Sequence, residues 1–174
     1  GELWKEDPQG ILVEHRAVDT CVRALTELLN WLPQLPPDAP VAITASGPAD
    51  PYLLPPMLAS MTLQERGMQS RNLGPSTPIG TIVLAVERYR ASLCSLSVSA
   101  PQERKHHAEW DSLVDRLERS HTRLVVGGRC VNSLPPRFLG RIHVCASMSE
   151  LSSYAAGMDH GVGSGLKPES GRKR

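Results

Sequence analysis

Short apolar runs alternate with helix-like segments from residue 41 to residue 158, and this alternation limits the possible folds more than any other feature of the sequence. The connections between runs and helices are short, as is typical of βα units. Five such units predict a doubly wound, five-stranded parallel sheet, because right-handed crossovers place helices on both faces. The expected strands are 41–45, 69–73, 93–98, 124–126 and 141–145, and the expected helices are 52–66, 78–89, 102–121 and 148–158.

A helical segment precedes the region of the sheet. Within residues 11–32, apolar side chains recur at helical spacing, and a turn is expected at 7–10. A single helix cannot bury its own apolar stripe, so this one must pack on the α/β domain or on further helices. The stripe consists of Val18, Val22, Leu25, Leu28 and Leu29. The predicted domains are a partial helical-bundle segment that forms a cofactor lid (1–33), a proline-rich linker (34–40), an α/β domain (41–160) and a disordered basic tail (161–174).

Composition and charge argue against several classes of function. The net charge of +1 argues against a general nucleic-acid surface. No apolar run approaches the roughly 20 residues that a membrane span needs, and the start has no signal-peptide pattern, so we expect a cytoplasmic protein. The four cysteines are scattered without a CxxC pair, which predicts reduced thiols and no zinc site. No nucleophile–base pair or phosphate-binding loop is evident, so we do not expect an enzyme.

Polar and glycine-rich loops follow three of the expected strands, at residues 45–52, 97–99 and 127–129. Because the carboxyl ends of parallel strands meet at one edge of a sheet, the three loops should lie together, and ligands bind at this edge in doubly wound folds. Serine hydroxyls can hydrogen-bond a polar ligand. A glycine pair lets a ligand approach the backbone, since no Cβ is in the way.

The spacing of the three loops resembles that of the cobalamin (B12)-binding domain family, whose fingerprint is DxHxxG, then an SxS-like pair, then GG. Here Asp50-Pro-Tyr52-Leu-Leu-Pro55 is followed after 41 residues (56–96) by Ser97-Val-Ser99, and after 27 more (100–126) by Gly127-Gly128. The resemblance implies a flavodoxin/Rossmann-like fold. It also implies that the serine and glycine pairs line the slot that takes the nucleotide tail of the cofactor.

The sequence departs from the family pattern at the cobalt ligand. Tyr52 stands where the family has the histidine that binds cobalt from below, and Pro55 replaces the last glycine of the motif. In the family, the aspartate at the position of Asp50 holds the other nitrogen of that histidine. Beside Tyr52, the charge of Asp50 would oppose a phenolate, and a neutral phenol is a poor cobalt ligand. We therefore expect no lower protein ligand.

A second resemblance lies in the helical segment. Trp4, followed after nine residues by Glu14-His15, is similar to the W-x9-EH pattern of CarH-type light-sensing transcription regulators of the MerR family. This resemblance implies that a helical bundle covers the upper face of adenosylcobalamin and that these three residues contact the upper ligand. It also implies an excised fragment of a longer regulator that forms homo-oligomers and binds DNA only through a domain absent from this chain.

The sequence thus predicts a sensory tetrapyrrole-binding module of a transcriptional regulator, with cobalamin (adenosylcobalamin or another corrinoid) as ligand. The resemblance to light-sensing regulators further implies a photosensory role. Three alternatives stay open. A bilin such as biliverdin, or haem, could occupy the same site, with Arg129 or Arg71 as donors for its propionates. The domain could bind no cofactor and serve protein interactions. Finally, it could be a corrinoid-carrier subunit of a methyltransferase.

Overall fold

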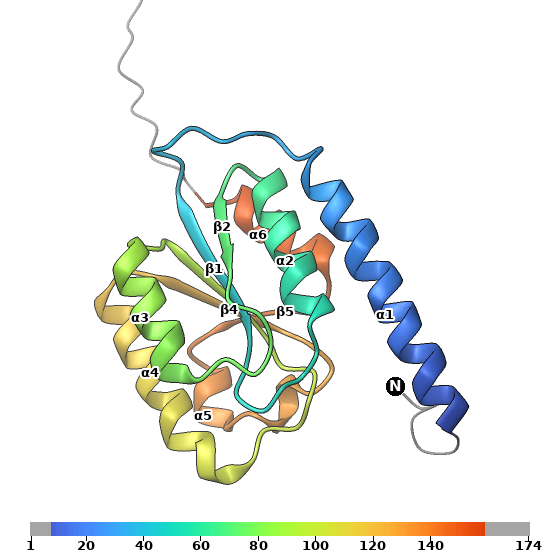
Figure 1. Ribbon diagram of the computed structural model, residues 1–174. Helices are drawn as coiled ribbons and strands as arrows, with labels where there is room; N and C mark the ends of the chain where they lie inside the picture. Colours follow the sequence, from blue (N-terminus) through green and yellow to red (C-terminus); the bar gives the residue numbers. More distant parts are fainter. Residues whose placement is uncertain (1–7, 159–174) are drawn as a thin grey trace, which may run out of the picture.

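The computed structural model describes residues 8–158, and at its centre lies an all-parallel sheet with the strand order β2-β1-β3-β4-β5 (Figure 1). This order is the flavodoxin-like arrangement of a doubly wound sheet, so the predicted fold class is confirmed. The strand order reverses between β1 and β3, which is where ligands bind in such sheets. The strands are β1 (Val41–Ser46), β2 (Gln69–Asn72), β3 (Leu93–Ser97), β4 (Arg123–Gly127) and β5 (His143–Cys145).

Helices cover both faces of the sheet. α2 and α6 lie on one face, and α3, α4 and the short α5 lie on the other (Figure 1). The helices are α2 (Leu54–Glu65), α3 (Ile79–Tyr89), α4 (His107–Arg119), α5 (Pro136–Leu139) and α6 (Met148–Ala156), with single 3₁₀ turns at η2 (Arg104–His106) and η3 (Val131–Ser133). The prolines at the start of α2 occupy its first turn, where a missing N–H costs little.

The two cores differ in the size of their side chains. On the α3/α4 face, Trp110 and Phe138 are buried and pack edge to face, with ring centroids 5.3 Å apart. On the α2/α6 face, the strand ends carry smaller side chains, such as Ser95 and Ser97. Because these residues do not fill the space beneath the helices, this face of the sheet has room for a cavity at the carboxyl ends of the strands.

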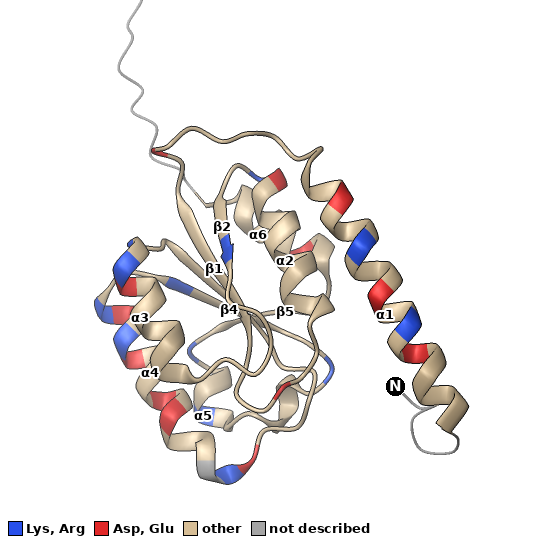
Figure 2. Cartoon of the chain, viewed as in Figure 1, with Lys and Arg blue, Asp and Glu red and all other residues tan. Residues whose placement is uncertain are grey.

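The first helix, α1 (Pro8–Leu29), packs along the outside of α2 (Figure 1). No residue of α1 is fully buried, and its inner side is half-buried at Glu14, Val18, Val22 and Leu25. The predicted stripe is wrong at its end, because Leu28 is 52% exposed. Figure 2 shows acidic and basic residues interspersed along the helix, with no stripe of one sign.

Two details of the expected elements are wrong. The turn expected at 7–10 is not present at its described positions, since α1 already begins at Pro8, a residue that suits the first helical position. The helix expected at 102–121 is shorter, because the 3₁₀ turn η2 precedes α4 and the helix ends at Arg119. Sequence periodicity also did not indicate η3 and α5, which are too short to show a period.

All four cysteines are free, as expected. Cys94 and Cys145 are buried, and burial raises the pKa of the Cys94 thiol to about 12. Across residues 8–158, no helix is long and apolar enough to cross a membrane.

Candidate functional site

The three predicted loops meet at one edge of the sheet, and Asp50 ties two of them together. Its side chain is fully buried in the loop that follows β1. One carboxylate oxygen accepts a hydrogen bond from the backbone N–H of Ser99 at 2.6 Å, and the other accepts from the N–H of Tyr52 at 3.1 Å. Asp50 therefore fixes the loops after β1 and β3 against each other through backbone amides. It does not engage the side chain at position 52.

Tyr52 is held by a cation from the third loop. Its phenol oxygen accepts a hydrogen bond from Nη2 of Arg129 at 2.6 Å, and the guanidinium carbon lies 4.9 Å from the ring centroid. The Nε of Arg129 donates to the carbonyl of Ser99 at 2.9 Å. A phenol–guanidinium pair thus links all three loops, at the position where the sequence resemblance would place a cobalt ligand.

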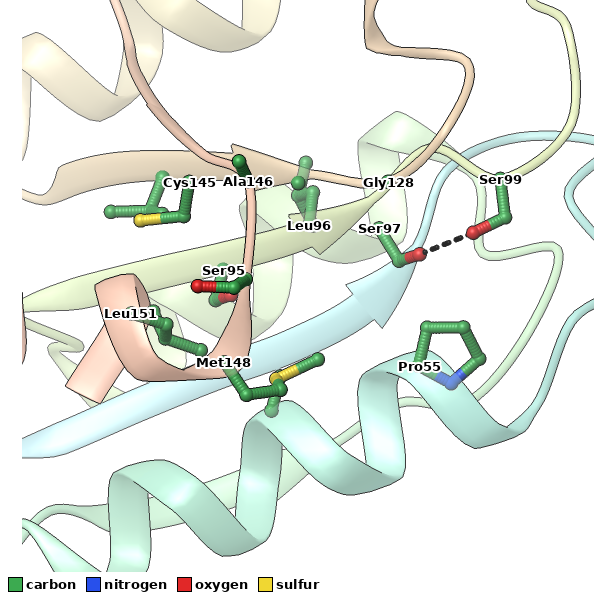
Figure 3. A pocket seen from close by; sticks show the side chains of 14 residues that line it. Pro55, Ser95, Leu96, Ser97, Ser99, Gly128, Cys145, Ala146, Met148 and Leu151 are labelled. Atoms are coloured by element: carbon green, nitrogen blue, oxygen red, sulfur yellow. Dashed lines mark hydrogen bonds between the residues drawn. The ribbon is translucent and has the colours of Figure 1, made fainter.

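A cavity of about 290 Å³, here called the slot, opens between α2, α6 and the ends of β3, β4 and β5 (Figure 3). The hydroxyls of Ser97 and Ser99 lie at its rim, 3.1 Å apart, and hydrogen-bond to each other. Four of the predicted site residues therefore line one cavity, since Gly127 and Gly128 do so as well. The other lining residues are Pro55, Ala59, Ser95, Leu96, Val125, Cys145, Ala146, Ser147, Met148 and Leu151.

Ser95 is a slot residue that sequence reasoning missed. It lies in β3 and, in Figure 3, it projects toward Met148 and Leu151. Its cross-strand neighbour in β1, Thr44, is fully buried, and the Thr44 hydroxyl has no hydrogen-bond partner among the described residues. The signal was present in the sequence: Ser95 is two residues before Ser97, and residues two apart in a strand share a face.

The glycine pair is required by the chain's own packing, whether or not it also lets a ligand approach. Gly128 has φ +115°, which L side chains rarely adopt, and a Cβ built there would lie 2.5 Å from the carbonyl oxygen of Val98. A Cβ on Gly127 would lie 2.9 Å from the carbonyl oxygen of Cys145. Both glycines let β4 and its loop pack closely against neighbouring backbone, and both still line the slot.

A second cavity of about 620 Å³, here called the groove, lies between α1 and the start of α2. The predicted lid residues Glu14 and His15 line it from α1, and Tyr52 lines it from the loop after β1. Pro55 lines both groove and slot, so the two cavities adjoin. Trp4, the third predicted lid residue, lies outside the described residues, as do residues 161–174 of the tail.

The groove is mainly apolar, and its remaining lining residues are Val18, Asp19, Val22, Pro51, Leu53 and Leu54. Arg71, a possible donor for a bilin, lies in β2, with its guanidinium carbon 5.6 Å from the ring centroid of Tyr89, and lines neither cavity. Among residues 8–158, no group of three or more His, Cys, Asp or Glu side chains could hold a metal ion.

Comparisons with known proteins find likeness in structure only. No family model matches the sequence, and no curated protein matches it. A corrinoid protein for monomethylamine from Methanosarcina barkeri has a TM-score of 0.64 and 20% identity, over 90% of this chain and 74% of its own. A cobalamin-binding protein from Desulfitobacterium hafniense DCB-2 has a TM-score of 0.54 and 17% identity, over 67% of this chain.

The methanol:cobalamin methyltransferase complex of Methanosarcina barkeri also matches, with a TM-score of 0.53 and 12% identity over 70% of this chain. The match spans 58% of the Desulfitobacterium chain and 49% of the chain from the methyltransferase complex. At these identities the likeness establishes a common fold: the chain has the Rossmann-like α/β architecture of solved cobalamin-binding and corrinoid proteins.

Proposed function

We propose that this chain is a sensory tetrapyrrole-binding module of a transcriptional regulator, and that it binds a cobalamin-type ligand without a lower histidine. The observation that carries the proposal is the adjoining pair of cavities, the groove and the slot, which share Pro55. A macrocycle with a tail needs a wide apolar site beside a narrower one that offers a few hydroxyl groups. The groove volume of about 620 Å³ lies within the range of roughly 300–1,000 Å³ that small-molecule sites occupy, and the slot is near the lower end of this range.

The residues of the slot fit the nucleotide tail of a cobalamin. The hydroxyls of Ser95, Ser97 and Ser99 stand at or near the strand ends, where a base and a ribose need hydrogen-bonding partners. The wall formed by Met148 and Leu151 supplies apolar contact for an aromatic base. The tail would therefore lie between the sheet and the helices α2 and α6.

Tyr52, in contrast, does not fit the lower cobalt position. Its phenol oxygen already accepts a 2.6 Å hydrogen bond from a guanidinium group, and a neutral phenol is a weak ligand beside an imidazole. The ligand would be held by the groove and the slot, with its own base retained or with no lower ligand from the protein. When bound, a cobalamin would supply a visible chromophore, and adenosylcobalamin would also supply a cobalt–carbon bond that light can cleave.

The lining of the groove favours a sensor. Glu14 and His15 face the same cavity as Tyr52, which is where the resemblance to light-sensing regulators implies contact with the upper ligand. No catalytic pair is evident in the sequence, so we propose a binding protein and not an enzyme. The regulatory role and the photosensory role both rest on this resemblance.

The second candidate is a corrinoid-carrier subunit of a methyltransferase. It is favoured by the structural likeness to the Methanosarcina barkeri corrinoid protein over 90% of this chain. Tyr52 argues against this candidate, because carriers of this fold usually bind cobalt from below through a histidine. Illumination separates the two candidates: a sensor loaded with adenosylcobalamin should change its spectrum and its oligomeric state together, whereas a carrier should change only its spectrum.

The test of the proposal is a set of visible-absorption titrations of the purified chain with hydroxocobalamin, adenosylcobalamin, biliverdin and haem. We expect saturable, one-to-one binding of a cobalamin at micromolar concentration. If biliverdin or haem binds more tightly than the cobalamins, the groove and the slot are still the binding site, but the ligand is a bilin or haem. If none of the four binds, the proposal is refuted, and the domain is better explained as a protein-interaction module without cofactor.

A further inference from the structure

Arg129 is an exposed cation beside the slot, and two hydrogen bonds fix its direction. Its neighbours Gly128 and Ser99 line the slot, whereas Arg129 itself lines neither cavity. It directly follows Gly128, and its Nε and Nη2 donate to the carbonyl of Ser99 and the phenol of Tyr52. It forms no salt bridge with an acidic side chain among residues 8–158. The more peripheral Arg141, by comparison, is paired with both Asp115 and Glu118. Within the described part of the chain, Arg129 is therefore held in place without a salt-bridge partner.

The acceptor that Arg129 now has is weaker than the acceptors that a guanidinium group prefers. A guanidinium carries five N–H donors in a planar fork that matches carboxylate and phosphate oxygens. A carboxylate or a phosphate carries a negative charge and can accept two parallel N–H bonds from this fork, whereas the phenol oxygen of Tyr52 is neutral and accepts one. An anion that reaches Arg129 can therefore displace the phenol of Tyr52 while the bond to the Ser99 carbonyl is kept.

The pair stands where the two cavities meet. Ser99 and Gly128 line the slot, and Tyr52 lines the groove. We propose that Arg129 binds an anionic group of the ligand, a phosphodiester or a carboxylate, where slot and groove meet, and that Tyr52 competes for the same guanidinium in the ligand-free protein. This inference rests on the proposed function and names the ligand group that the site selects.

Competition makes a prediction that a purely structural role does not make. Tyr52→Phe removes the competing acceptor but keeps the ring under the guanidinium, so it should tighten the binding of an anionic ligand. Arg129→Gln removes the cation, so it should weaken binding. Both changes delete the same 2.6 Å hydrogen bond. If that bond served only to brace the loops, both variants would shift affinity in the same direction.

The experiment measures dissociation constants by visible-absorption titration of the full chain. The first pair of ligands is hydroxocobalamin and cobinamide, which lacks the phosphate and the base. The second pair is haem and its dimethyl ester, which lacks the carboxylates. For the member of the binding pair that carries the anionic group, Arg129→Gln should weaken binding by about tenfold or more, and Tyr52→Phe should tighten it several-fold. The member that lacks the anionic group should respond to neither change.

Arg123→Gln is the matched control, because Arg123 is an exposed arginine at the opposite end of β4; it should leave all affinities unchanged. Circular dichroism and thermal unfolding establish that each variant is folded. Affinity shifts of the same sign in Tyr52→Phe and Arg129→Gln, or equal shifts for both members of a ligand pair, overturn the inference and leave the proposed function standing. Absence of binding by all four ligands overturns the inference, and the proposed function falls with it when adenosylcobalamin and biliverdin do not bind either.

Discussion

Replacement of Gly128 by alanine tests whether the glycine pair is needed by the protein's own backbone. At φ +115° an alanine is strained, and its Cβ would lie 2.5 Å from the carbonyl oxygen and 2.9 Å from the nitrogen of Val98. Relief of this overlap moves the loop away from Val98. That movement weakens the 2.9 Å hydrogen bond from the N–H of Cys130 to the Val98 carbonyl.

The expected magnitude combines two terms. Backbone strain of this kind costs on the order of 1–3 kcal/mol, and loss of one hydrogen bond costs about 1 kcal/mol. The free energy of unfolding should therefore fall by about 2–4 kcal/mol, which corresponds to a midpoint lower by roughly 4–16 °C in a domain of this size. Urea unfolding followed by circular dichroism, together with a thermal melt, measures both quantities.

Gly67 offers a matched control. Its φ is also positive, at +83°, but a Cβ built on it would meet nothing within 4 Å. Gly67→Ala should lower the free energy of unfolding by only about 1–2 kcal/mol, the cost of an alanine in left-handed backbone. Part of this cost is offset because alanine also reduces the conformational entropy of the unfolded chain. If Gly128→Ala and Gly67→Ala destabilise the protein equally, the close approach of Gly128 to Val98 adds nothing to stability, which refutes the claim that the backbone packing requires glycine there.

Two further changes test the loops and the slot. Asp50→Asn removes the negative charge from a buried acceptor of two backbone N–H groups. Urea unfolding should therefore show a free energy of unfolding lower by about 1.5–3 kcal/mol. Asp115→Asn, at an exposed position, is the control and should be near-neutral; equal losses in the two variants would argue that Asp50 does not brace the loops. In alkylation with iodoacetamide at pH 8, read by peptide mass spectrometry, the exposed Cys21 should react first. Cys94 should stay unmodified, because burial raises its pKa to about 12 and keeps it a thiol at that pH. Cys145 lines the slot, and its pKa is raised by burial and, to a smaller extent, by the charge of Glu150. A bound ligand should therefore slow the alkylation of Cys145 further. Faster alkylation of Cys94 than of Cys21 would contradict the burial of β3.

Much of the fold could be predicted from the sequence because each βα unit carries a strong local signal. The apolar runs at 41–45 and 93–98 are short and bounded by turn residues, and they form β1 and β3 within one residue of the expected limits. The late start of α4 was not predictable in this way, because the charged stretch before it has the composition of a helix start, yet it forms a 3₁₀ turn.

For the site, the parallel topology predicted that the three loops meet, and the contacts of Asp50 and Arg129 bear this out. The spacing could not predict the partner of Tyr52. Arg129 lies 77 positions away in sequence, and only the packed loops determine which way each side chain points. Nor could sequence reveal that Val98 occupies the space beside Gly128, because both a ligand and the chain's own backbone require glycine at such a position.

The central claim is that the slot receives the tail of a tetrapyrrole ligand, and Ser95→Leu tests it most directly. The larger side chain fills part of the cavity of about 290 Å³, and additional buried methylene groups contribute about 0.8 kcal/mol each, so the folded protein should not lose stability. The same change at the exposed Ser153 of α6 is the control. The measurement is the dissociation constant of hydroxocobalamin from visible-absorption titrations. The dissociation constant should rise at least about tenfold for Ser95→Leu and stay unchanged for Ser153→Leu. If Ser95→Leu binds hydroxocobalamin as tightly as the unmodified protein does, the slot does not receive the tail.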